Sequence, residues 1–281
     1  MNSSFPVILV NGRAVQQVSV LDRGLAYGHG LFETIRVNNG LPQLWQQHLA
    51  RLKVGCERLF IQWPEDIEAK LTQEVAELCA RSNALIKIIF TAGSGGLGYA
   101  IPEAQTPMRI VIRYPLPDYP LEYTTAGIAV CTCDYRLAQQ TRLAGLKHLN
   151  RLDQVLASAE WRGSKYKEGI MLDQQDRVIE GTRSNLFAVD KNGDLLTPQL
   201  SRCGVMGVMR QYLIEQAALC HIKVLEGDYS SAQLKAMPEL FVCNSLIGIW
   251  PIRQWDQHDY SVGEITRRLQ LLVKKLFVVQ S

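Results

Sequence analysis

The segment Ala144–Asp153, with the sequence Ala-Gly-Leu-Lys-His-Leu-Asn-Arg-Leu-Asp, places a single lysine among apolar residues. A glycine precedes this lysine, and a pattern of helical spacing follows it to about Trp161, so the sequence predicts Lys147 at a helix start. An apolar setting disfavours the ammonium form and leaves a nucleophilic amine near neutral pH. Lys147 is therefore a candidate for covalent bonding to a carbonyl compound, the alternative being an ordinary surface lysine.

Two further segments carry groups of chemical interest. Val178–Phe187 reads Val-Ile-Glu-Gly-Thr-Arg-Ser-Asn-Leu-Phe, in which Glu180 is either a solvated turn residue or an acid held against an apolar pair. Gly204–Arg210 opens a helix predicted to run to Leu219, and the free N–H groups of a helix start favour an anion. The expected donors are Gly207 and the amides of Val208 and Met209, with ordinary glycine packing as the alternative.

Taken together, the Lys147 and Glu180 segments resemble those of the fold-type IV pyridoxal-phosphate enzymes, the class IV aminotransferase-like family, and the resemblance covers nearly the whole chain. It implies that pyridoxal 5'-phosphate is the cofactor, that Lys147 is the catalytic lysine holding its aldehyde, and that Glu180 is the acid at its pyridine nitrogen. Its phosphate contacts would be Gly207, Val208, Met209, Arg51 and either Asn244 or Ser245. Residues expected on the substrate side are Tyr27, His29, Glu33, Arg36, Tyr99 and His148.

Within that family, the run Leu-Lys-His-Leu-Asn-Arg is most similar to members that release 4-aminobenzoate and pyruvate from 4-amino-4-deoxychorismate in folate biosynthesis, and this lyase activity is expected. An aminotransferase of the same fold, acting on D-amino acids or branched-chain amino acids, is the first alternative. It stays open because Ala92 and Leu97 stand where lyase relatives often carry arginine. A non-catalytic binding protein is the second alternative, and the presence of both Lys147 and Glu180 argues against it.

The chain length of 281 residues exceeds that of a usual single-core domain, so two domains are predicted. A proline-rich linker at 117–121 would join an N-terminal α/β domain, 1–116, to a C-terminal domain, 122–281, carrying the cofactor lysine. The resemblance implies an α/β (α+β) fold-type IV architecture, similar to D-amino-acid aminotransferase. A hairpin is expected around Asn11-Gly12, with strands at 7–10 and 14–18. Further strands are expected at 31–37, 85–91, 108–114, 127–133, 169–172, 186–189 and 240–243, and helices at 45–60, 64–78, up to 161, 204–219 and 262–279.

Composition excludes several classes of partner. The net charge is only +3 and the 30 basic residues are scattered, so no nucleic acid is expected. No apolar run has bilayer length and no signal-like start is visible, so we expect a cytoplasmic protein without membrane contact. The seven cysteines lack a CxxC pair and are expected to be reduced core residues rather than metal ligands. The resemblance further implies a small-molecule substrate and a homodimer with sites near the subunit interface.

Overall fold

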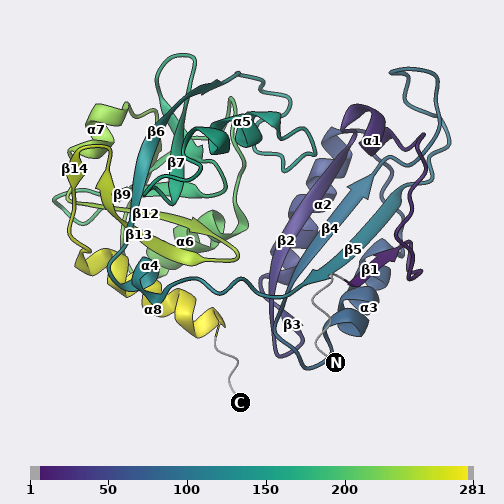
Figure 1. The fold of residues 1–281 in the computed structure, drawn as a ribbon, viewed down its shortest axis with the longest axis horizontal. Coiled ribbons are helices and arrows are strands. Elements are labelled where there is room, and N and C mark those ends of the chain that lie inside the picture. Colours follow the sequence, from purple (N-terminus) through teal and green to yellow (C-terminus); the bar gives the residue numbers. More distant parts are fainter. Residues whose placement is uncertain (1–6, 278–281) are drawn as a thin grey trace. The chain divides into compact units, whose positions relative to one another are not determined.

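The computed structural model describes residues 7–277, which form two compact units (Figure 1). The first contains the described residues up to Pro117 together with Leu146–Asn150, and the second contains Asp118–Gly145 and Arg151–Phe277. The segment with Lys147 therefore belongs to the first unit, although its position in the sequence lies within the range predicted for the second domain. None of the helices in residues 7–277 combines the length and the apolar character needed to cross a membrane.

The first unit is built on a five-stranded sheet in the order β1-β5-β4-β2-β3, with every neighbouring pair antiparallel. Inward-facing side chains alternate along β2 and β4, as the two-residue period of a strand requires. The apolar sides of α2 and α3 pack with them into one core. The strands are β1 (Val7–Val10), β2 (Gly30–Asn38), β3 (Leu41–Pro42), β4 (Ala84–Thr91) and β5 (Met108–Tyr114), and the helices are α1 (Arg23–Tyr27), α2 (Trp45–Arg58) and α3 (Ile67–Cys79).

The predicted N-terminal hairpin is only half correct. Asn11 and Gly12 adopt the positive φ angles of 49° and 79° expected of the turn, and Val10 and Arg13 exchange backbone hydrogen bonds across it. The predicted strand at 14–18 is wrong: this segment makes no ladder with β1, and its side chains are exposed. A strand needs a buried face or a stable partner, and residues 14–18 have neither.

The second unit is built on a nine-stranded mixed sheet. Its main path is β11-β10-β9-β12-β13-β6-β7-β8, and β14 pairs with β13. The strands are β6 (Ile128–Leu137), β7 (Glu168–Asp173), β8 (Val178–Gly181), β9 (Asn185–Val189), β10 (Leu195–Pro198), β11 (Val224–Gly227), β12 (Glu239–Asn244), β13 (Gly248–Trp255) and β14 (His258–Asp259). The helices are α4 (Leu121–Thr125), α5 (Leu152–Glu160), α6 (Val208–Leu219), α7 (Ser231–Lys235) and α8 (Glu264–Phe277).

The strands of this unit carry apolar residues on both faces. Every residue of β7, β8, β9 and β10 is buried, so these strands form the interior of the unit. Most helices and strands predicted from the apolar patterns are present with small shifts of their ends, and the end of the predicted helix at 262–279 lies outside the described residues. An antiparallel sheet in the first unit and a mixed sheet in the second, each with helices, agree with the predicted α/β (α+β) class.

Candidate active site

Lys147 does not lie at a helix start. Helix α5 begins at Leu152, and the segment containing Lys147 is extended and pairs with the beginning of β2. The amide of Phe32 donates to the Lys147 carbonyl over 3.0 Å, and the amide of Leu149 donates to the Gly30 carbonyl over 3.0 Å. Backbone pairing, rather than a helix, therefore fixes the position of Lys147.

The Lys147 side chain lies over the face of an aromatic ring. Its Nζ is 4.3 Å from the centroid of Phe32, a cation–π arrangement that keeps the amine over an apolar surface. In an extended segment, neighbouring side chains point to opposite sides, so Lys147 and His148 face different directions. Leu146, on the other side, is buried in the core of the first unit.

Arg51 is held by a buried carboxylate. Glu33, on β2, accepts from Arg51 Nε over 2.8 Å and also forms an ion pair with Arg51 Nη2, while His48 Nδ1 donates to Glu33 Oε2 over 2.6 Å. Burial opposes ionisation of Glu33, but Arg51 and His48 outweigh it and lower its pKa to about 2. Burial disfavours the charged form of His48 as well, and it therefore lowers the pKa of His48 despite the adjacent carboxylate. Glu33 thus positions Arg51 rather than standing free on the substrate side.

The other substrate-side residues predicted in the first unit occupy different settings. His29 has both ring nitrogens engaged: Nδ1 accepts from Arg23 Nε over 3.2 Å, so the proton lies on Nε2, which donates to the Leu59 carbonyl over 2.7 Å. Tyr27 and Tyr99 lie together with ring centroids 5.3 Å apart. Arg36, on β2, donates from Nε to Asn38 over 3.0 Å, and burial lowers its pKa.

In the second unit, Glu180 is a buried residue of β8 and not a solvated turn residue, with only 3% of its surface exposed. Its Oε2 accepts from the Val205 amide over 2.8 Å and from Asn185 Nδ2 over 3.4 Å. Asn185 Nδ2 also donates to the Val205 carbonyl over 2.9 Å. One loop amide and one strand side chain therefore orient the carboxylate.

Helix α6 begins at Val208 with Gly207 as its N-cap residue, and no side chain caps this end. The amides of the first turn, including those of Val208 and Met209, have no partner within a helix, so the helix start is suited to an anion. A Cβ on Gly207 would lie 2.0 Å from Asn185 Oδ1, which explains why this position is glycine.

The two candidate phosphate contacts at the end of β12 are Asn244, its last residue, and Ser245. The side-chain Oδ1 of Asn244 accepts from the amides of Leu246 and Ile247, both over 2.9 Å, and its Nδ2 donates to the Arg183 carbonyl over 3.0 Å. Asn244 therefore shapes the turn between β12 and β13. Ser245 is the next residue of that turn.

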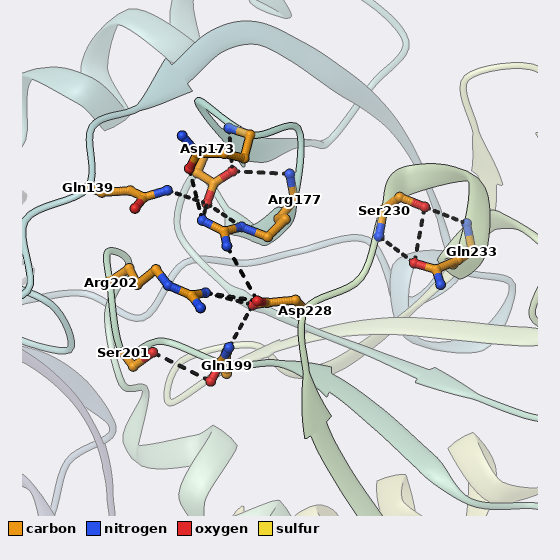
Figure 2. A network of polar contacts seen from close by, with 10 residues as sticks. Gln139, Asp173, Arg177, Gln199, Ser201, Arg202, Asp228, Ser230 and Gln233 are labelled. Carbon is orange, nitrogen blue, oxygen red and sulfur yellow. Dashed lines mark hydrogen bonds and ion pairs between the residues drawn. The ribbon is translucent and has the colours of Figure 1, made fainter.

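A polar network supports the loop that contacts Glu180 (Figure 2). Arg202 Nη1 donates to both carboxylate oxygens of Asp228 over 2.9 Å, and Arg177 joins Asp228 to the buried Asp173. The Arg202 carbonyl in turn accepts from the Gln140 amide over 2.8 Å. Sequence reasoning missed this network, because its members are far apart along the chain and have no local pattern.

The backbone of this loop continues the connection. The Gly145 amide donates to the Gly204 carbonyl over 2.9 Å, and the Met206 amide donates to the Gly145 carbonyl over 3.0 Å. The network therefore supports both the loop that orients Glu180 and the residues immediately before Leu146-Lys147. His48 was also missed, and the only available signal was its place three residues before Arg51 on one face of α2.

Comparison with known proteins defines the class. Residues 30–255 match the family described as amino-transferase class IV, and the chain belongs to that family. It is 34% identical to the aminodeoxychorismate lyase of Vibrio harveyi over 93% of this chain and 97% of the relative.

Solved structures confirm the predicted fold-type IV architecture. The structure of 4-amino-4-deoxychorismate lyase from Pseudomonas aeruginosa has a TM-score of 0.91 and 47% identity, covering 95% of this chain and 98% of that one. A branched-chain amino acid aminotransferase from Escherichia coli has a TM-score of 0.84 and 25% identity, covering 96% of this chain and 94% of that one.

Proposed function

We propose that the protein is a pyridoxal-phosphate-dependent lyase that converts 4-amino-4-deoxychorismate into 4-aminobenzoate and pyruvate in folate biosynthesis. The observation that carries the proposal is the 47% identity to the Pseudomonas aeruginosa lyase over 95% of the chain, against 25% to the Escherichia coli aminotransferase. The site residues support a cofactor enzyme of this class because amine, acid and anion-binding groups are all present.

The donor set fits pyridoxal phosphate. Lys147 would hold the aldehyde, the buried Glu180 would face the pyridine nitrogen, and the helix start at Gly207 would take the phosphate. Arg51 would add a cationic contact. Of the two turn residues, Ser245 is the better phosphate contact, because the Asn244 side chain already binds three backbone groups.

When bound, the cofactor ring withdraws electrons from the amine-bearing carbon of the substrate. Nζ of Lys147 would remove the proton from that carbon, and Glu180 would keep the pyridine nitrogen protonated. Loss of the enolpyruvyl group then makes the six-membered ring aromatic. Lys147 carries the proton that the departing group needs to leave as pyruvate.

On the substrate side we assign Tyr27, Tyr99, Arg36 and His148. The loop Ala92–Tyr99 contains no arginine, so Arg36 is a candidate for meeting a carboxylate, and the tyrosines offer apolar surface for the ring. Both nitrogens of His29 are used within the first unit, which does not favour direct substrate contact.

The alternative is an aminotransferase acting on D-amino acids or branched-chain amino acids. Its support is the TM-score of 0.84 to the Escherichia coli enzyme. A transaminase needs a carboxylate clamp that serves two amino acids in turn, and arginine is best shaped for it. A transaminase would have to place this clamp elsewhere in the chain, because Ala92–Tyr99 contains no arginine.

We further infer a cytoplasmic homodimer with sites near the subunit interface. Support for a second copy comes from large apolar side chains on the surface of the first unit, among them Val20, Leu21 and Leu25. All seven cysteines are free, as in a reducing compartment. Light scattering of the purified holoenzyme would test the dimer, and a monomer at micromolar concentration would contradict it.

The deciding assay supplies the cofactor-loaded protein with 4-amino-4-deoxychorismate generated in situ. Equal amounts of 4-aminobenzoate and pyruvate are expected. Rapid amino-group transfer from D-alanine or a branched-chain amino acid, with no 4-aminobenzoate formed, would favour the aminotransferase instead.

A further inference from the structure

Within residues 7–277, Arg23 is a buried arginine without a carboxylate partner. It lies in α1 with 3% of its surface exposed, and its guanidinium forms no ion pair with any residue from 7 to 277. Its Nε donates to His29 Nδ1 over 3.2 Å. Arginine is seldom buried without strong partners, so its remaining contacts indicate what it is used for.

Those contacts are carbonyl groups of one loop. Arg23 Nη1 donates to the carbonyls of Gly95 and Gly98, both over 3.1 Å, and Nη2 donates to the Tyr99 carbonyl over 3.3 Å. A planar guanidinium has five donors in a fixed fork, so it can bridge three carbonyls at once, which an ammonium group cannot do in the same geometry.

The base of the same loop is tied to the same turn. The amide of Arg23 donates to the Gly93 carbonyl over 2.8 Å. Thr91 Oγ1 donates to Asp22 Oδ2 over 2.8 Å and accepts from the Gly93 amide over 3.0 Å. Asp22 and Arg23 together therefore anchor the loop at its base and at its tip.

The glycines of the loop allow this arrangement. Gly95, Gly96 and Gly98 have φ angles of 126°, 77° and 56°, which side chains rarely adopt. A Cβ on Gly96 would lie 2.5 Å from the Ala100 carbonyl oxygen and 3.1 Å from Arg23 Nη1, whereas a Cβ on Gly98 would have nothing within 4 Å.

Anchored in this way, the loop presents two large apolar side chains. Leu97 and Tyr99 are 91% and 86% exposed, and the Tyr99 ring lies 5.3 Å from that of Tyr27. Arg23 also lies against Tyr27, with Cζ 5.1 Å from the ring centroid. Because a glycine-rich loop is flexible by itself, these contacts decide where Leu97 and Tyr99 stand.

We propose that Arg23 is a positioning residue for substrate recognition, which holds the loop Gly93–Tyr99 in one conformation so that Leu97, Tyr99 and Tyr27 receive the six-membered ring of the substrate. This rests on the proposed lyase function. Ordering the loop in advance reduces the entropic cost of binding. Loss of the anchor should therefore raise KM and leave kcat nearly unchanged.

The experiment compares three variants as cofactor-loaded enzymes. Arg23→Lys keeps the charge but cannot bridge the carbonyls, and Gly96→Ala disturbs the loop without changing Arg23. Both should raise KM for 4-amino-4-deoxychorismate about tenfold, with kcat within about threefold of wild type. Gly98→Ala is the matched control, because it has a positive φ but open space, and its KM should rise less.

Limited digestion with chymotrypsin supplies a local readout. Cleavage after Leu97 and Tyr99 should be faster in Arg23→Lys and Gly96→Ala than in wild type, while the visible absorbance of bound cofactor stays normal. If Arg23→Lys does not fold, the KM values and cleavage rates of Gly96→Ala and Gly98→Ala still test the proposal.

Unchanged KM and unchanged cleavage would overturn the inference, as would a parallel loss of kcat and of cofactor. A wild-type enzyme that makes no 4-aminobenzoate would instead refute the proposed function, and the cleavage rates would then decide the anchoring by themselves.

Discussion

The backbone amide of Val205 donates a hydrogen bond of 2.8 Å to Oε2 of Glu180. The residue before it, Gly204, accepts from the Gly145 amide over 2.9 Å, two positions before Lys147. One loop therefore contacts both the acid assigned to the cofactor nitrogen and the segment that leads to the assigned lysine. The roles assigned to Lys147 and Glu180 can each be tested by substitution, and so can the role of the Arg202–Asp228 network that supports this loop.

Lys147→Ala should abolish turnover and the absorbance band of the covalently attached cofactor, because no amine remains at this position to bind the aldehyde, while the fold persists. Borohydride reduction of the wild-type holoenzyme followed by peptide mapping should label Lys147. Lys87 is the matched control, since its Nζ also lies over Phe32, 5.4 Å from the ring centroid. Labelling of Lys87, or of any lysine other than Lys147, would show the assignment to be wrong.

Glu180→Gln keeps the volume of the side chain and removes the charge that keeps the pyridine nitrogen protonated. Turnover should fall by about a hundredfold or more, the scale for losing a preorganised electrostatic partner. Cofactor affinity should change much less, because the phosphate and lysine contacts remain. Glu215→Gln, on the exposed side of α6, is the control. Near wild-type turnover in Glu180→Gln would remove this residue from the mechanism.

Asp228→Asn should weaken cofactor binding without abolishing folding, because it loosens the Arg202 side chain and with it the loop that orients Glu180 (Figure 2). We expect the dissociation constant of pyridoxal phosphate to rise about tenfold, equivalent to about 1.4 kcal/mol. Fluorescence titration of the cofactor-free protein would measure it. Asp176→Asn breaks the exposed ion pair with Arg136 and serves as control. Equal affinities in the two variants would contradict a positioning role for the network.

Glu33 should make the stability of the protein depend on pH in the acid range. Its pKa in the folded state, about 2, lies below the ordinary value of 4.5, so its contribution is complete above pH 4.5 and is lost as the pH falls towards 2. The shift corresponds to roughly 3 kcal/mol of unfolding free energy.

Urea unfolding at pH 5 and pH 3 tests this dependence. Glu33→Gln should be less stable than wild type at pH 5, and the difference should narrow at pH 3. Asp66→Asn, which removes an exposed pair with Lys70, should leave the pH dependence almost unchanged. A constant difference between Glu33→Gln and wild type at both pH values would show that Glu33 is not ionised in this way.

Local sequence pattern was sufficient for most of the secondary structure. Strands β2 and β4 and helices α2 and α3 lie where they were predicted. Their buried residues recur at the spacing of a strand or a helix, and this spacing can be recognised among neighbouring residues of the sequence. The same local character made the Lys147 and Glu180 segments recognisable as those of the class IV family.

The local sequence pattern gave a wrong prediction where pairing with a distant strand decides the structure. The glycine and apolar residues around Lys147 resemble a helix start, yet the segment pairs with β2, more than a hundred residues earlier in the sequence. For the same reason, the sequence could not place Leu146–Asn150 with the first unit.

The sequence by itself thus indicated the family, the longer helices and many of the strands along the chain, and the candidate chemical groups. Only the tertiary structure decided which partners orient those groups: Glu33 and His48 for Arg51, Val205 and Asn185 for Glu180, and three loop carbonyls for Arg23. The physical reason is that hydrogen bonds and ion pairs of buried groups are satisfied by whatever the fold brings near, and most of these partners lie far away in the sequence.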